Sequence, residues 1–457
     1  MGRSEKLRGL KIWLCTLGCR SNLYESEALA GELASRGASV ADDPDGCDAA
    51  LIVSCSVTAM ADKKCRQAVR KAQRELQSQG KKGIVAVCGC WAQGLDAVEA
   101  REMGIDVLVG NRLKHLMPAL IEDALIEGAL LDGAPGNKKF TDMRLDLEAG
   151  RLWDSLSLER PLLRTRFFLK VQEGCDHFCT YCVIPFLRGR STSRPLGEVL
   201  SEARRVVEHG CKEIVLTGTH LGVYGRKCGT SLAELIIKLS AIPGLMRLRL
   251  GSLEPFTLDV ELLNALAESP VFCRHLHLPM QSGDDAVLAR MRRGYKAEDF
   301  ARACDSAKEA LGDNLHVSSD VMAAFPGEDD AAFENTLKMM RRVPLGRVHV
   351  FPYSPRKGTE AANFPGQVPH KTASERVKAA MAFGQSLLES YSSRFVGQTL
   401  SVLVEDRNKV MGKNSLVGYT RNFVSTVILS ETDIETGEEI TARMTKCSGG
   451  KLFGVRV

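Results

Sequence analysis

The segment Gly174-Cys175-Asp176-His177-Phe178-Cys179-Thr180-Tyr181-Cys182 has three cysteines in a Cys-x3-Cys-x2-Cys spacing. Three thiolates are too few for a closed structural zinc site, which normally has four ligands. They suit a four-iron cluster that keeps one iron open, because cysteine thiolates are the usual ligands of iron–sulfur clusters and their spacing selects the cluster. A zinc knuckle or a disulfide loop is the alternative.

The spacing of Cys175, Cys179 and Cys182 resembles the signature of the radical S-adenosylmethionine (SAM) superfamily. The resemblance implies that these residues hold a 4Fe–4S cluster whose open iron chelates the amino and carboxyl groups of SAM. It also implies that an electron from the cluster cleaves SAM to methionine and a 5′-deoxyadenosyl radical.

Length and composition indicate the number of domains and the compartment of the protein. A chain of 457 residues should hold about three domains. The N-terminus is polar, and the sequence has no apolar run long enough for a membrane span. Fifteen cysteines without a secretory signal favour metal or redox chemistry in a reducing compartment over disulfides. We therefore expect a cytoplasmic protein that does not cross a membrane.

Three further cysteines follow apolar runs in the first part of the chain. The runs cover residues 10–15, 49–53 and 84–88. Cys19, Cys55 and Cys90 come just after them, and helical patterns separate them, which indicates a parallel α/β sheet. Because parallel strands end at one edge, the three thiols are expected to converge there and to hold a second cluster with an open iron. The alternative is that they are small buried side chains, which we accept for Cys15 and Cys88.

The sequence around these three cysteines resembles the N-terminal domain of the radical SAM methylthiotransferases, the family with MiaB, RimO and MtaB branches. The matching segments are residues 16–26 (Thr-Leu-Gly-Cys-Arg-Ser-Asn-Leu-Tyr-Glu-Ser), 54–58 and 89–93. The first segment is most similar to the MtaB branch. The resemblance implies that Cys19, Cys55 and Cys90 hold the auxiliary 4Fe–4S cluster. Ser54 departs from the family pattern, in which many members have Asn.

Basic residues gather in two places. Arg66, Arg70 and Arg74 have the i, i+4, i+8 spacing of one helix face. This stripe could bind phosphates or be an ordinary solvated face, and the sequence does not decide between them. Residues 160–195, which include the Cys175–Cys182 segment, are also rich in Lys and Arg, which suits a polyanionic partner.

We expect four segments. The change in composition at residues 131–160, which contain Gly and Pro, indicates an inter-domain linker. The resemblance implies that residues 8–130 form the methylthiotransferase N-terminal domain, 161–393 the radical SAM domain and 395–457 a TRAM domain. The central part repeats short strands followed by turns and helices, which predicts a barrel or partial barrel with its chemistry at the carboxyl ends of the strands. The resemblance implies an open (βα)6 barrel.

The resemblance also implies SAM-binding positions at strand ends. These are Thr217, Gly218, Ser252, Glu254 and Gln281. For Ser252 and Gln281, simple capping of a strand end is the alternative. We expect no catalytic side chain beyond the cluster ligands.

The last part of the chain has short strands broken by Gly and Asn, which predicts a small β-barrel of about five strands like an OB fold. By position it resembles the TRAM domain, an RNA-binding module. Arg421-Asn422-Phe423 is the best local candidate for stacking on a base.

Taken together, the resemblance implies methylthiolation at C2 of N6-threonylcarbamoyladenosine next to the anticodon of tRNA. SAM would be methyl donor and radical source, two 4Fe–4S clusters would face one cavity, and a flavodoxin- or ferredoxin-like protein would supply electrons. The alternatives within the family are isopentenyladenosine of tRNA (MiaB-like) and an aspartate of a ribosomal protein (RimO-like). Outside it they are a non-catalytic RNA-binding or iron-storage protein, or a radical SAM enzyme with different chemistry.

Overall fold

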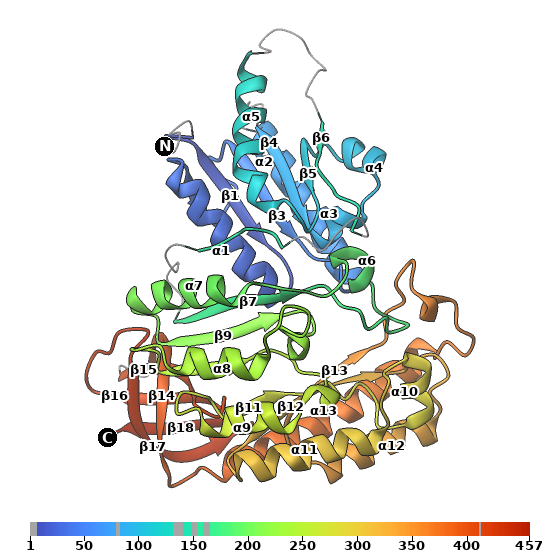
Figure 1. Ribbon diagram of the computed structural model, residues 1–457, viewed down its shortest axis with the longest axis vertical. Helices are drawn as coiled ribbons and strands as arrows, with labels where there is room; N and C mark the ends of the chain where they lie inside the picture. Colours follow the sequence, from blue (N-terminus) through green and yellow to red (C-terminus); the bar gives the residue numbers. More distant parts are fainter. Residues whose placement is uncertain (1–6, 79–82, 131–139, 148–152, 159–164, 411–412) are drawn as a thin grey trace. The chain divides into compact units, whose positions relative to one another are not determined.

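The computed structural model describes residues 7–78, 83–130, 140–147, 153–158, 165–410 and 413–457 (Figure 1). The chain forms two compact units. The first comprises Met1–Leu162, Glu173–Asp176 and Cys182–Arg194, and the second comprises Leu163–Gln172, His177–Tyr181 and Pro195–Val457. Within the described ranges, no helix has the length and apolar character needed to cross a membrane.

A parallel sheet forms the centre of the first unit. Its strands are β1 (Lys11–Thr16), β2 (Ser39–Ala41), β3 (Ala49–Ser54), β4 (Ile84–Gly89), β5 (Val107–Val109) and β6 (Thr141–Asp142). They are hydrogen-bonded in the order β2-β1-β3-β4-β5-β6. Leu14 of β1 lies opposite Leu51 of β3, and Leu51 lies opposite Ala86 of β4. Since β1, β3 and β4 are adjacent and parallel, their carboxyl ends share one edge.

Helices cover this sheet (Figure 1). The helical segments of the first unit are α1 (Arg20–Ser35), α2 (Ala59–Ser78), α3 (Cys90–Gly94), α4 (Ala97–Glu102), η1 (Lys114–Leu116), α5 (Met117–Leu130) and α6 (Ile184–Arg188); the short β8 (Thr192–Ser193) follows. Ile52 and Val87 pack with Val69 and Leu76 of α2 in one apolar cluster. Every residue of β3 and β4 is buried, which explains why these strands are continuous apolar runs.

Part of the segment predicted as a linker belongs to the first unit. Thr141 N donates to Asp106 O at 2.9 Å, which places β6 on the sheet edge. Asp154 Oδ2 accepts from Lys114 N at 2.8 Å. Residues 140–147 and 153–158 are therefore packed parts of this unit, whereas 131–139, 148–152 and 159–160 lie outside the described residues. Composition could not show this, because an edge strand of two residues leaves no periodic pattern.

The second unit contains a partial barrel. Its parallel strands are β7 (Arg166–Glu173, its last residue grouped with the first unit), β9 (Glu213–Gly218), β10 (Arg247–Leu250), β11 (His275–His277), β12 (His316–Ala323) and β13 (Leu345–Pro352). One set has the order β10-β9-β7 and the other β11-β12-β13. Parallel bridges from Leu248 to Phe272 and from Ser252 to His277 join the two sets. This arrangement confirms the predicted α/β fold with an open barrel.

Helices follow the barrel strands in turn (Figure 1). They are α7 (Leu196–Glu208), η2 (Leu221–Val223), α8 (Leu232–Ser240), η3 (Pro255–Thr257), α9 (Val260–Glu268), α10 (Asp285–Met291), α11 (Ala297–Leu311), α12 (Asp330–Arg342), η4 (Glu360–Asn363) and α13 (His370–Ser393). Ser231, Asp259 and Asp329 accept backbone N–H groups at the starts of α8, α9 and α12. Such caps satisfy donors that the first helical turn leaves free.

The C-terminal residues of the second unit form a small closed β-barrel, as predicted. Its strands are β14 (Thr399–Val410), β15 (Lys413–Thr420), β16 (Ser425–Ser430), β17 (Glu439–Ser448) and β18 (Lys451–Arg456). They close in the order β14-β15-β16-β18-β17. Val402, Leu416, Ile428, Ala442 and Leu452 are buried in its core.

The Arg421–Phe423 segment of this barrel contacts the central strands instead of presenting a free stacking surface. Arg421 donates to Met246 O at 3.2 Å and to Pro270 O at 2.9 Å. The Arg249 guanidinium lies 4.8 Å from the centre of the Phe423 ring. The prediction that this segment stacks on a base is therefore corrected, because its cation and its aromatic ring are both used within the chain.

Candidate functional site

Cys19, Cys55 and Cys90 all lie directly after strands of the first unit. Cys19 is the N-cap of α1, Cys55 follows β3, and Cys90 opens α3 directly after β4. Because β1, β3 and β4 are neighbours in a parallel sheet, the structure brings these three residues to the same edge, as the sequence predicted.

Close contacts hold this edge together. A Cβ added to Gly18 (φ 110°) would lie 2.7 Å from Cys55 Sγ, so only glycine fits beside that thiol. Asn22 Nδ2 donates to Leu17 O at 2.6 Å and to Ser54 O at 2.9 Å. The Cys19 thiol donates to Asn22 Oδ1 at 3.7 Å. Asn22 therefore ties the turn that carries Cys19 to the strand end that carries Cys55.

Ser54 has a structural role at this sheet edge. Its hydroxyl donates to Cys88 O at 2.6 Å and accepts from Ala92 N at 3.2 Å. The hydroxyl thus connects the end of β3 with β4 and with α3. A Cβ on Gly89 (φ 102°) would lie 2.5 Å from Ser54 O, so only glycine allows the end of β4 to approach this strand end so closely.

The three thiols influence one another electrostatically. Burial raises the pKa of Cys55, the charges of Cys19 and Cys90 raise it further, and the Arg188 guanidinium opposes them. Burial also raises the pKa of Cys90, again opposed by Arg188. Neighbouring buried thiols of this kind ionise only with a cationic partner, so the donor set fits a thiolate-bound iron–sulfur cluster.

The described residues contain no group of three His, Cys, Asp or Glu side chains that could hold a single metal ion. A four-iron cluster places each thiolate on a different iron, so its ligands do not converge on one point.

Arg188 is a residue that the sequence analysis missed. It is 1% exposed, and its Nε donates to Cys90 Sγ at 3.1 Å. In the sequence it belonged to the basic segment assigned to a polyanionic partner. Arg188 and Arg194 are both buried, so neither serves as a surface cation. No periodic pattern could have shown that Arg188 contacts a residue 98 positions earlier.

The three arginines predicted to share one face of α2 differ in their environment. Arg66 forms an ion pair with Glu99 and lies 5.6 Å from the centre of the Trp91 ring. Arg70 and Arg74 are exposed. Arg74 Nε lies 3.9 Å from Glu75 Oε1.

The Cys175–Cys182 segment is shared between the units. Cys175 and Cys182 are half-buried and grouped with the first, whereas Cys179 is buried and grouped with the second. Cys175 N donates to Gly189 O at 3.0 Å. A Cβ on Gly174 (φ 70°) would lie 2.2 Å from Arg190 O, so this turn requires glycine.

Cys179 has a cationic environment. Arg293 is 3% exposed and donates to Cys179 Sγ at 3.3 Å. Burial acts to raise the pKa of the Cys179 thiol, but a hydrogen bond with His177 and the charge of Arg293 outweigh it, and the net pKa is lowered. Cys179 is therefore predisposed to be a thiolate, the form that binds iron.

The five predicted SAM-binding residues lie at or just after strand ends. Thr217 and Gly218 end β9, and Ser252 follows β10. Glu254 forms an ion pair with Arg293, which connects it to Cys179. Gln281 has φ 64° and a buried Oε1 to which none of the described residues donates a hydrogen bond. A side chain that capped its strand end would use this oxygen, so the free acceptor fits a ligand with an N–H or O–H donor.

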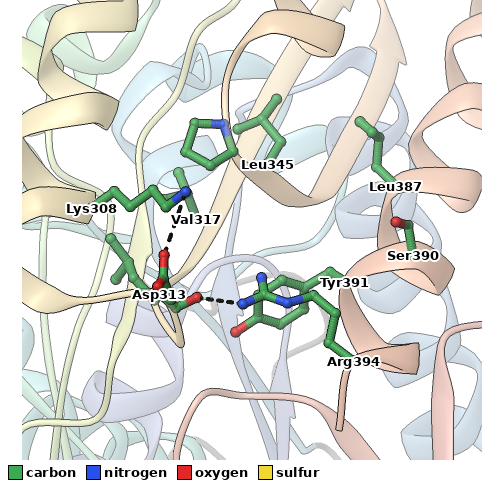
Figure 2. Close-up of a pocket in the computed structure, with 10 residues that line it drawn as sticks. Lys308, Asp313, Val317, Leu345, Leu387, Ser390, Tyr391 and Arg394 are labelled. Atoms are coloured by element: carbon green, nitrogen blue, oxygen red, sulfur yellow. Dashed lines mark hydrogen bonds and ion pairs between the residues drawn. The ribbon is translucent and has the colours of Figure 1, made fainter.

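A cavity near α13 does not suit a cofactor. It has a volume of about 140 Å³ and lies between Lys308, Asp313, Tyr391 and Arg394 (Figure 2). Lys308 Nζ lies 3.6 Å from Asp313 Oδ1, and Arg394 donates to Asp313 O at 2.9 Å. Since these polar groups pair with one another, we assign no ligand to it.

Comparison with known proteins defines the class. Residues 169–340 match the family model described as "Radical SAM superfamily", and residues 11–110 match "Uncharacterized protein family UPF0004". Among solved structures, the radical SAM methyltransferase TsrM from Kitasatospora setae has a TM-score of 0.56 at 16% identity, covering 75% of this chain and 72% of that one. At this identity the similarity shows the fold alone. The fold and the matched residues make this protein a radical SAM enzyme.

Similar sequences identify the family. The "Threonylcarbamoyladenosine tRNA methylthiotransferase MtaB" of Bacillus subtilis (strain 168) is 36% identical over 434 residues, 94% of this chain and 93% of the relative. The protein of the same name from Thermotoga maritima is 35% identical over 412 residues, 90% and 89%. The "tRNA-2-methylthio-N(6)-dimethylallyladenosine synthase" of Syntrophotalea carbinolica is 32% identical over 414 residues, 90% and 91%. The chain belongs to the radical SAM methylthiotransferase family.

Proposed function

We propose that this enzyme transfers a methylthio group to C2 of N6-threonylcarbamoyladenosine next to the anticodon of tRNA. The observation that carries the proposal is the placement of Cys19, Cys55 and Cys90 at one sheet edge, in a chain that also has the Cys175–Cys182 segment. The Cys175–Cys182 segment accounts for one cluster, so the first three thiols are available for a second one, which sulfur insertion requires. Relatives named for threonylcarbamoyladenosine support the choice of substrate.

Two 4Fe–4S clusters and SAM are the cofactors of this proposal. Cys175, Cys179 and Cys182 would hold one cluster, and Cys19, Cys55 and Cys90 the auxiliary cluster. The first cluster and SAM supply radical chemistry, because the C2–H bond of an adenine is not acidic enough for a general base at neutral pH. We expect a flavodoxin- or ferredoxin-like electron donor and a cytoplasmic location, since fifteen cysteines in one chain suit a reducing compartment.

The side chains of the chain orient and protect these groups. Arg293 and His177 lower the pKa of the Cys179 thiol, which favours its thiolate form. Gln281 Oε1 is an acceptor for a donor group of SAM or of the substrate. Asn22 and Gly18 fix the spacing between Cys19 and Cys55.

A second candidate substrate is isopentenyladenosine of tRNA. The 32% identity to a protein named for the dimethylallyl nucleoside supports it. The two substrates differ in chemistry, because the threonyl carboxylate needs a cation where the isopentenyl group needs an apolar wall.

The test is nucleoside analysis in a host that lacks its own threonylcarbamoyladenosine methylthiotransferase. The gene for this chain is introduced, and total tRNA is digested and examined by mass spectrometry. We expect the 2-methylthio derivative of N6-threonylcarbamoyladenosine to reappear. A triple Cys19→Ala, Cys55→Ala, Cys90→Ala variant is the matched control and should not restore it. Appearance of only the methylthio isopentenyl nucleoside would transfer the assignment to the second substrate.

A further inference from the structure

A buried guanidinium lies beside one ligand of the auxiliary site. Arg188 ends α6, and its Nε donates to Cys90 Sγ at 3.1 Å. Its other nitrogens donate to Asn22 Oδ1 at 2.7 Å, to Glu25 Oε1 at 3.3 Å and to Glu173. Contacts on all three nitrogens fix the plane of the guanidinium, which a lysine ammonium could not reproduce.

Arg188 belongs to a group of buried ion pairs in the first unit. Lys114 is fully buried and lies 3.0 Å from Glu25. Glu25 and Glu173 offset the charges of Arg188 and Lys114, and a third buried cation, Arg112, donates to Arg188 O at 3.2 Å. The carboxylates hold the guanidinium in place, and the guanidinium in turn directs an N–H to the sulfur of Cys90.

Arg188 also connects two parts of the sequence that carry different cluster ligands. Glu173 directly precedes the Gly174–Cys182 segment, and Arg188 lies six residues after Cys182. The ion pair between Glu173 and Arg188 therefore joins the residues that flank this segment. The hydrogen bond from Arg188 Nε to Cys90 Sγ connects these flanking residues to the auxiliary site. All of these residues belong to the first unit.

We propose that Arg188 is a positioning residue for the cluster held by Cys19, Cys55 and Cys90, and that its hydrogen bond to Cys90 raises the reduction potential of that cluster. The inference deepens the proposed function and rests on its auxiliary cluster. Reduction adds negative charge to a cluster, and a hydrogen bond or a positive charge at a ligand sulfur stabilises that charge. A raised potential suits a site that takes up the electron left over when a carbon radical bonds to sulfur.

The experiment uses the full chain with Cys175, Cys179 and Cys182 changed to Ala, so that only the auxiliary cluster forms. Arg188→Gln and Arg188→Lys are introduced into this background, and the proteins are reconstituted anaerobically. Iron and sulfide content is measured first, and the midpoint potential is then measured by a redox titration followed by electron paramagnetic resonance. Arg190→Gln is the matched control, because the Arg190 side chain lies in the same segment and is 47% exposed.

We expect Arg188→Gln to shift the reduction equilibrium at least tenfold towards the oxidised form, a fall of about 59 mV for one electron. Arg188→Lys keeps the charge but loses the Nε contact, so its potential should fall less. Arg190→Gln should match the parent protein.

Two results would overturn the proposal. One is an Arg188→Gln protein with full iron content and the parent potential. The other is loss of iron from both Arg188 variants while Arg190→Gln is loaded, because Arg188 would then support only the fold. If Arg188→Lys alone retains a cluster, a lowered potential supports the proposal and an unchanged one refutes it. No tRNA is present, so a failure here is independent of the nucleoside test.

Discussion

Arg249 offers a direct test of how the C-terminal barrel is attached to the central strands. The side chain is 2% exposed, and its Nε lies 2.7 Å from Glu213 Oε1. It also donates to Thr420 O at 2.9 Å and to Arg421 O at 2.8 Å, and it lies over the Phe423 ring. Arg249→Met keeps most of the apolar stem and removes every one of these polar contacts.

The expected loss of stability follows from these contacts. Removing one partner of a buried ion pair costs about 3–5 kcal/mol. Each carbonyl that loses its donor adds about 1–3 kcal/mol. Arg247 stays 3.7 Å from Glu213 and compensates part of the loss, so we expect a net loss of about 4 kcal/mol. With a urea slope of roughly 3 kcal/mol/M, the midpoint should fall by about 1 M or slightly more.

Urea unfolding followed by two spectroscopic probes distinguishes the first unit from the rest of the chain. The three tryptophans, at positions 13, 91 and 153, all belong to the first unit, so their fluorescence reports on that unit, whereas circular dichroism reports on the whole chain. We expect a lowered midpoint by circular dichroism and a smaller change by fluorescence. Arg341→Met is the control, because Arg341 is 54% exposed in its pair with Glu334 and should cost at most about 1 kcal/mol. An Arg249→Met midpoint equal to that of this control would refute the reasoning.

The other predictions concern the clusters and pH. Arg293→Gln should weaken iron retention at the Cys175–Cys182 site at least tenfold in a chelator challenge, whereas Arg302→Gln should not, because Arg302 forms an exposed pair with Asp299 on α11; equal iron loss from both variants would contradict this role. Cys19→Ala should abolish methylthiolation while SAM cleavage, measured as 5′-deoxyadenosine, persists; loss of both activities would count against separate sites. Burial lowers the pKa of His316 from 6.5 to about 4, so its neutral form supports the fold above pH 6.5, and that support, about 3 kcal/mol, is lost as the pH falls towards 4. His316→Gln should flatten stability across this range, and an unchanged pH profile would contradict the assignment.

The sequence predicted the features that depend on local patterns, such as which residues follow the end of a strand. Cys19, Cys55 and Cys90 could be placed together because each follows an apolar run, and parallel strands end at a common edge. The β-barrel at the C-terminus could be predicted from short strands separated by Gly and Asn. In both cases a pattern of neighbouring residues is enough to predict the strand and its end.

Contacts between distant residues could not be predicted. Arg188 and Glu25 are 163 positions apart, and nothing near Arg188 distinguishes it from an exposed cation in a basic segment. Arg293 is buried against Cys179, a residue 114 positions earlier, and no local pattern indicates that contact. The stretch Arg421–Phe423 was assigned to RNA, because the sequence does not show that the central strands already occupy these side chains.

The discontinuous path of the first unit limits how this chain can be divided. A fragment ending at residue 162 would include Glu25, Lys114 and Cys90 but would lack Glu173 and Arg188. Its interior would then hold a carboxylate and a thiol without their guanidinium. During synthesis the N-terminal unit can become complete only after the ribosome has passed residue 194, so a gene that encodes the apparent N-terminal domain alone is expected to yield an unfinished protein.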